Sequence, residues 1–188
     1  MLDPVHEPYA PPPLSPVCGK SLPPFIIRSA VPDDTDALAA LLREGYGEGL
    51  SGDYHPNVLS AALPVISQPK DALVRSGTYF VADSGAGRLL GAGGWSWSGP
   101  LGGVPPRDCA HMRHVVVGRG FKGRGIGRLL LGHARASARR AGVSRLLCLS
   151  TISAAGFYEA QGFSRQGEVA LSLQPGLSFP AVQMEGPA

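Results

Sequence analysis

Apolar and polar positions follow one another along the chain with periods typical of alternating strands and helices. Short apolar runs predict strands over 25–29, 78–83, 88–97, 109–117 and 145–149, with later strands over 163–173 and 181–184. Apolar residues at helical spacing predict helices over 33–45, 57–66, 125–141 and 154–161. The glycine-rich stretch 45–56 is expected to interrupt the first helix, because glycine is a poor helix former.

Two connections follow from this order of elements. The strands over 78–83 and 88–97 are expected to form a hairpin around 84–87, and residues 98–107 are expected to be a loop. The strand over 109–117, the helix over 125–141 and the strand over 145–149 predict parallel neighbours joined by a right-handed crossover. The buried face of that helix is expected to hold Ile126, Leu129, Leu130, Ala134 and Ala138.

Length and composition indicate one domain with an ordered core. The chain has 188 residues, 44% of them hydrophobic. Residues 1–24 hold eight of the 18 prolines and are expected to be a disordered tail before a domain over 25–188. No apolar run is long enough for a membrane span and no secretory signal is evident, so we expect a cytoplasmic protein that binds no membrane. Cys18, Cys109 and Cys148 match neither a disulfide framework nor a metal site.

Charge is unevenly distributed along the chain. Residues 109–158 contain nine Lys or Arg residues and no acid, whereas the remainder has eight basic and fourteen acidic residues. This segregation favours a site for a local anionic ligand over a surface that binds nucleic acid.

A glycine-rich junction lies within the basic segment. Residues 118–127 read Gly-Arg-Gly-Phe-Lys-Gly-Arg-Gly-Ile-Gly and join the strand over 109–117 to the next helix. Glycines allow a tight turn with exposed N–H groups, and the helix start adds a positive dipole end. Arg119, Lys122, Arg124 and Arg128 lie among these glycines. The junction therefore predicts a site for a phosphorylated cofactor.

Two common phosphate motifs fit this junction poorly. Residues 118–123 spell G-x-G-x-x-G, but the dinucleotide motif expects an acidic residue about 20 positions later, and the next acid is Glu159. A P-loop is excluded because no G-K-[ST] follows four spacer residues.

A third pattern fits better. Residues 122–127, Lys-Gly-Arg-Gly-Ile-Gly, resemble the [RQ]-x-x-G-x-[GA] acyl-CoA loop of the GNAT N-acetyltransferase superfamily. Residues 154–163 resemble its A-x-x-[LF]-Y-E-x-x-G-F signature, and residues 27–38 resemble its first strand and helix start. Lys122 replaces the usual Arg or Gln, and Thr151 stands where many relatives have Asn. The resemblance covers about 25–185 and implies the GNAT acyl-CoA N-acyltransferase fold, an α/β (α+β) fold with a mixed six- to seven-stranded sheet flanked by helices.

The resemblance also implies how the site works. An acetyl group would pass from acetyl-CoA to a primary amine, by direct attack in a ternary complex and without a metal. Tyr158 occupies the general-acid position, where a phenol can protonate the departing thiolate, although it can equally be an aromatic packed beside Phe157 and Phe163. The residues implied to bind the cofactor are Val115, Val117, Lys122, Gly123, Arg124, Gly125, Ile126, Gly127, Arg128 and Thr151.

The general base and the acceptor are less specified. Strand alternation predicts that His111 lies on the same face as Arg113, Val115 and Val117. From this face His111 could accept the amine's proton, or it could be a buried structural histidine. His114 is expected on the opposite face, as a structural residue. Some relatives need no dedicated base. The acceptor, a small-molecule or peptide amine, is expected to meet a wall formed by Tyr46, Tyr54, Trp95, Trp97 and Arg113.

Two other readings of the sequence stay open. A CoA-binding regulatory module would keep the glycine junction without turnover, which the lack of an acidic base on the strand over 109–117 allows. A nicotinamide dinucleotide enzyme ranks third. The sequence does not identify the acceptor, and it leaves a homodimer open.

Overall fold

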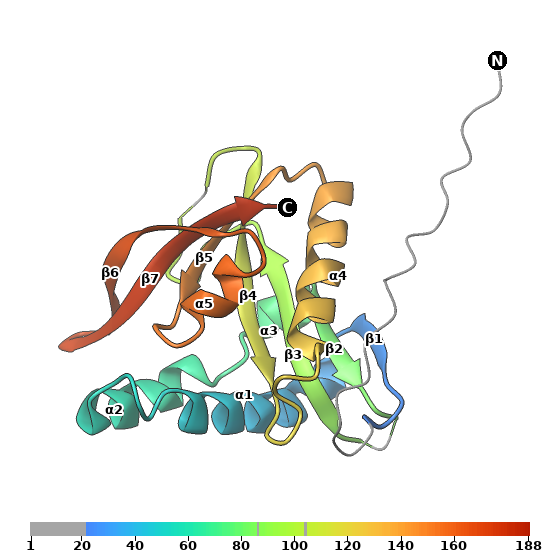
Figure 1. Ribbon diagram of the computed structural model, residues 1–188, viewed down its shortest axis with the longest axis horizontal. Helices are drawn as coiled ribbons and strands as arrows, with labels where there is room; N and C mark the ends of the chain where they lie inside the picture. The colour runs from blue at the N-terminus through green and yellow to red at the C-terminus, as the bar shows by residue number, and fades with distance from the viewer. Residues whose placement is uncertain (1–21, 86, 104) are drawn as a thin grey trace.

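The computed structural model describes residues 22–85, 87–103 and 105–188, and within them the chain forms a single seven-stranded sheet with helices on both faces (Figure 1). The elements in chain order are β1 (Ile26–Ser29), η1 (Pro32–Asp34), α1 (Thr35–Gly49), α2 (Pro56–Ile66), α3 (Asp71–Val74), β2 (Tyr79–Asp83), β3 (Leu89–Ser96), β4 (Cys109–Val117), α4 (Ile126–Arg140), β5 (Arg145–Ser150), α5 (Ala155–Glu159), β6 (Ser164–Gln174) and β7 (Leu177–Pro187). The strand order is β1-β2-β3-β4-β5-β7-β6.

The sheet is mixed, as the sequence predicts. β4 and β5 are parallel and are joined through α4, while the other neighbouring pairs are antiparallel. The expected hairpin is present as β2 and β3, which pair from Tyr79 with Gly94 to Asp83 with Leu89. The hairpin and the parallel pairing of β4 with β5 are therefore both confirmed.

Two layers of helix cover the sheet (Figure 1). α4 and α5 pack on one face, where Leu130, Leu131 and Tyr158 join the main core. α1 and α3 pack on the other face through a second cluster that includes Leu38 and Val74. The inward side of α4 differs slightly from the prediction, because Leu131 is buried and Leu129 is only half-buried.

The first helix runs further than the sequence predicts. α1 continues through the glycines to Gly49, so the expected interruption at 45 is wrong. A Cβ atom placed on Gly45 would lie 2.2 Å from Val116 Cγ2, and only glycine allows α1 to lie this close to β4. Packing against the sheet thus outweighs the low helix propensity of glycine.

β4 contains a bulge that reverses the side-chain alternation. Ala92 pairs with Val116 and Gly94 with Arg113, so one β3 residue opposes two on β4. His114 has a φ of 40°, a left-handed conformation that is uncommon outside glycine. Val115 and Val117 therefore face α4, whereas His111 and Arg113 face the α1 side. The prediction that these four residues share one face is wrong for this reason.

β4 and β5 separate after a short paired segment. Their ladder covers only Cys109–His111 against Arg145–Leu147, although β4 continues to Val117 and β5 to Ser150. Beyond this segment the edge of β4 that faces β5 has no strand partner. An extended ligand can therefore lie between the two strands.

The structure also contains a short helix, α3, that the sequence did not predict. Most of the expected tail, residues 1–21, lies outside the described residues, but Leu22 packs against the main core. Each helix in the described part of the chain is too short or too polar to span a bilayer.

Candidate active site

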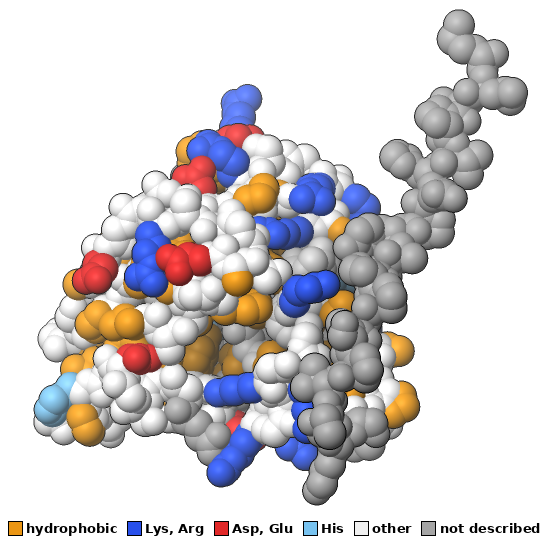
Figure 2. All heavy atoms as spheres, in the orientation of Figure 1, with side chains coloured by type: hydrophobic (Ala, Val, Ile, Leu, Met, Phe, Trp, Pro, Cys, Tyr) orange, Lys and Arg blue, Asp and Glu red, His pale blue; other side chains and the backbone are white. Residues whose placement is uncertain are grey.

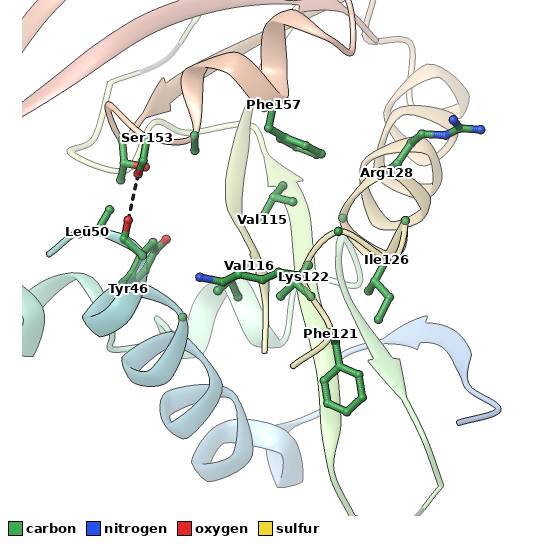
Figure 3. Close-up of a pocket in the computed structure, with 18 of the residues that line it drawn as sticks. Tyr46, Leu50, Val115, Val116, Phe121, Lys122, Ile126, Arg128, Ser153 and Phe157 are labelled. Atoms are coloured by element: carbon green, nitrogen blue, oxygen red, sulfur yellow. Dashed lines mark hydrogen bonds between the residues drawn. The ribbon is translucent and has the colours of Figure 1, made fainter. Parts of the chain in front are cut away.

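A cavity of about 480 Å³ opens where β4 separates from β5 (Figure 3). Its walls come from the end of α1, the last residues of β4, the glycine junction with the start of α4, and the turn into α5. It is lined by Gly45, Tyr46, Gly49, Leu50, Val115, Val116, Val117, Phe121, Lys122, Gly123, Gly125, Ile126, Gly127, Arg128, Thr151, Ser153, Ala154, Phe157 and Gln161. Every predicted cofactor-binding residue except Arg124 is in this lining.

The glycine junction has the backbone geometry of an anion site. Gly123 and Gly125 have φ angles of 74° and 85°, a left-handed conformation that side-chain-bearing residues rarely adopt. α4 begins directly afterwards at Ile126, so its first N–H groups and its positive dipole end face the cavity. The junction can thus bind a phosphate through backbone groups.

Basic side chains supplement these backbone groups. Lys122 extends across the cavity from the junction toward α1 (Figure 3), where its Nζ would lie 3.4 Å from a Cβ on Gly49. The backbone N–H of Arg119 donates to Glu44 Oε1 at 2.9 Å, which ties the junction to α1. Figure 2 shows Lys and Arg side chains gathered on the side of the molecule that carries α4, beside an apolar hollow. The cavity therefore combines an apolar interior with a basic end.

Tyr158 lies beneath this cavity and does not line it. Its side chain is 5% exposed and packs edge-on between Phe157 and Phe163, with ring centroids 5.2 and 5.3 Å away. Burial and a hydrogen bond with the Cys148 thiol raise the pKa of Tyr158 well above its ordinary value. The phenol is therefore protonated at neutral pH, as a proton donor must be. Its packing also fits the purely structural alternative, so the acid role stays a prediction.

His111 lines neither this cavity nor the second one described below. Its imidazole lies against the loop after β3, where a Cβ on Gly99 would be 3.3 Å from Cε1. Its Nδ1 is buried without a hydrogen-bond partner, and burial together with the charge of Arg113 lowers the pKa of His111. The ring is thus neutral at pH 7, and its role as a base stays a prediction.

A second, smaller cavity of about 110 Å³ lies next to the first, on the α1 side of the sheet. It is lined by Tyr46, Ile66, Pro100, Leu101, Met112, Arg113, His114, Leu149, Thr151, Leu171, Leu173 and Phe179. Tyr46 and Thr151 line both cavities. The two cavities therefore meet at these residues.

The side chains of Tyr46 and His114 interact at this junction. The Tyr46 hydroxyl lies 2.9 Å from His114 Nδ1. Burial and nearby cations lower the pKa of His114 to about 4, so the neutral ring can accept the hydroxyl proton in a hydrogen bond. The sequence predicts a structural His114, because regular alternation places its side chain away from the site. The bulge that turns it toward the second cavity has no recognisable sequence signal.

The predicted acceptor wall is only partly assembled. Tyr46 and Arg113 line the second cavity. Tyr54 instead stacks on Phe179 and donates to the carbonyl of Pro180 at 3.0 Å. Trp95 is 2% exposed within the main core, and Trp97 packs edge-on against it at 5.2 Å. These last three aromatic residues line neither cavity, and Trp97 is 48% exposed.

Comparisons with known proteins agree with this geometry. Residues 75–165 match the family described as "Acetyltransferase (GNAT) domain". None of the curated proteins matches the chain. The described residues hold no cluster of three or more His, Cys, Asp or Glu side chains that could bind a metal ion.

Solved structures share the fold at low sequence identity. A GCN5-related N-acetyltransferase from Rhodopseudomonas palustris matches with a TM-score of 0.70 and 18% identity, over 90% of this chain and 100% of that one. The PaiA N-acetyltransferase from Thermoplasma acidophilum, in complex with coenzyme A, matches at 0.66 and 16%, over 88% and 99%. N-acetylglutamate synthase from Neisseria gonorrhoeae, complexed with coenzyme A and N-acetyl-glutamate, matches at 0.58 and 20%, over 87% of this chain but 35% of the synthase.

Proposed function

Since the chain carries a GNAT acetyltransferase domain, we propose that it transfers the acetyl group of acetyl-CoA to a primary amine, by direct attack within a ternary complex. One observation carries the proposal. The larger cavity joins the glycine junction and the start of α4 to the edge of β4 that β5 leaves unpaired. This arrangement offers a phosphate site at one end and free backbone groups for an extended thioester arm along the other.

The residues around this cavity fit acyl-CoA in three ways. Lys122 and the N–H groups at the start of α4 face the end where the pyrophosphate would bind, and Arg128 lines this end with its guanidinium directed outward (Figure 3). The unpaired backbone beside Val115 and Val117 can bond the pantetheine amides, and Thr151 closes the opposite wall. Acetyl-CoA supplies the activated acyl group; the protein supplies the position and the charge. The solved structures with coenzyme A named above support the same choice of cofactor.

Two groups of the chain would assist the transfer. A backbone N–H on the open edge of β4 would donate to the thioester oxygen as it becomes negative, an interaction typically worth ~3 kcal/mol. Tyr158 would give its proton to the departing thiolate, which requires its hydroxyl to reach the sulfur between β4 and β5. Its raised pKa means that the phenol carries its proton at neutral pH.

We retain His111 as the candidate base, acting through a water because its ring lines neither cavity. Its lowered pKa leaves the imidazole neutral at pH 7 and able to accept a proton. The loss of turnover in His111→Ala should shrink as pH rises, because the amine then deprotonates without help. A structural histidine would instead cost stability at every pH. Melting temperature and kcat, measured together from pH 6 to pH 9, separate the two roles.

The overall proposal is tested by ligand binding followed by turnover. Acetyl-CoA should raise the melting temperature as RT ln(1 + [L]/Kd) requires, and pantetheine without phosphates should do much less. Thiol release across a panel of amines then tests transfer. If acetyl-CoA binds but no amine causes release of the CoA thiol, the regulatory CoA-binding module is favoured. If NAD stabilises the protein and CoA does not, the dinucleotide enzyme is favoured.

A further inference from the structure

The second cavity contains a buried cation that the proposed transfer does not use. Arg113 is 5% exposed and lies just before the bulge in β4. Within the described residues, the hydrogen bond from its guanidinium goes from Nη1 to Ser96 Oγ at 2.9 Å. Most of its N–H groups therefore have no protein acceptor and face the cavity that Arg113 lines.

Among the side chains that the structure describes, no carboxylate forms an ion pair with this guanidinium. Burial lowers the pKa of Arg113 without discharging it, and the nearby hydroxyls of Tyr79 and Tyr46 act in the opposite direction. Arg28, by contrast, is more exposed and yet bonds both Asp34 and Asp83. A buried cation is costly unless an anion reaches it, so the absent partner is significant.

The surroundings of the cavity strengthen the positive charge. Lys70 donates from Nζ to the carbonyl of Pro100 at 2.9 Å, at the rim of the cavity. The charge of Lys70 helps to lower the pKa of His114, which lines the same cavity. The remaining lining is mainly apolar, with Ile66, Leu101, Leu149, Leu171, Leu173 and Phe179. The cavity thus pairs a cationic end with an apolar wall.

We infer that the acceptor is a small amine that also carries a carboxylate, an amino acid or a close analogue, whose carboxylate binds Arg113. The inference rests on the proposed function and narrows its substrate class. Because the two cavities meet at Tyr46 and Thr151, a carboxylate on Arg113 directs the amine toward the larger cavity. The cavity of about 110 Å³ suits a small apolar side chain.

The test compares acids with their amides. Alanine, valine and leucine, each beside its carboxamide, are assayed by thiol release at saturating acetyl-CoA. We expect kcat/KM for each acid to exceed that for its amide by about 10²-fold or more, because the amide leaves Arg113 without an anion. The amide's amine is the less basic of the two, so plain reactivity would give the opposite order. Equal values for acid and amide would overturn the inference and leave the transferase proposal standing.

Arg113→Met removes the charge and keeps much of the side-chain volume. The acid-to-amide ratio should fall to one or below in this variant, while the Kd for CoA, measured by calorimetry, stays unchanged. A ratio that persists would overturn the inference. If this variant does not fold, Ser96→Ala gives the answer, because it loosens the guanidinium without removing its charge. It should raise KM for the acids only, and an unchanged KM would again contradict the assignment.

Binding without turnover separates this inference from the function on which it rests. If no amine releases thiol, leucine and its amide are titrated into the CoA-loaded protein. Binding of the acid that Arg113→Met abolishes would support the carboxylate site even though transfer had failed. Absence of acid binding would overturn it.

Discussion

The two cavities that meet at Tyr46 and Thr151 are built in different ways. The larger takes most of its lining from the stretch 115–128 and from the turn into α5. The smaller draws its lining from α1, α2, β4, β5, β6, β7 and the loop after β3. A site for a phosphate can be encoded locally, because a turn and a helix start supply its donors. A site for a variable acceptor depends on how distant segments pack.

This difference predicts how each region responds to change. Substitutions in the larger cavity should act on cofactor affinity alone, and substitutions around the bulge should couple chemistry, pH and stability.

Tyr158→Phe has the largest expected effect on turnover. The ring keeps its packing between Phe157 and Phe163, but the donated proton is lost, so kcat should fall by ~10²- to 10⁴-fold with an unchanged Kd for CoA. Cys148→Ala is the matched control, because it removes the same hydrogen bond and leaves the phenol in place. An equal loss in the control would show a structural role, and full turnover in Tyr158→Phe would exclude the acid role.

Gly127→Asp should weaken CoA binding by at least about 10²-fold, because it places a carboxylate where the pyrophosphate is expected to bind. The fold should survive, since an acid in the first turn of α4 is favourable there. Gly127→Ala is the control: its Cβ would be 3.5 Å from Phe157 and Val117, an ordinary contact. Calorimetry with CoA distinguishes them. Comparable affinity in both variants would mean that the junction is only a turn.

His114→Asn tests the pH dependence of the bulge. The pKa of His114 is about 4 in the folded protein and about 6.5 when unfolded, so the unfolded state binds more protons between these values. His114 therefore contributes stability that is complete above pH 6.5 and decreases as pH falls toward 4, by up to ~1.4 kcal/mol per pH unit. Asn does not titrate and tolerates positive φ. Urea unfolding from pH 4 to pH 8 should show a shallower slope in the variant; identical slopes would contradict the assignment.

Lys122→Met should give the smallest effect. The side chain is exposed, so its attraction for a phosphate is worth about two- to five-fold in Kd at low salt and less at high salt. Arg75→Met serves as the control. Arg75 is the C-cap residue of α3, forms an ion pair with Asp71 in the same helix and lines neither cavity. Equal affinities for Lys122→Met and the wild type at every salt concentration would show that backbone groups alone hold the phosphates.

The elements that could be predicted from the sequence are those determined by residues close together in the chain. The pattern of apolar residues predicts β4, α4 and β5. The glycine junction is predictable because its backbone conformation strongly favours glycine at several positions. The extension of α1 was not predictable, because it depends on contact between Gly45 and Val116 across the fold. The orientation of Arg113 and His114 was missed for a similar reason. Counting alternate residues assumes a regular strand, and the bulge at His114 becomes evident only from the pairing with β3.

The bulge also has a consequence for how the chain tolerates insertions and deletions. One extra residue in β4 lets the strand present Arg113 to one side of the sheet and Val115 and Val117 to the other. Removing a single residue there would restore regular alternation and turn one of these groups to the wrong side, with every side chain otherwise intact. Sequence length in β4 is therefore under tight constraint, because a change of one residue would turn a group away from the cavity that it lines.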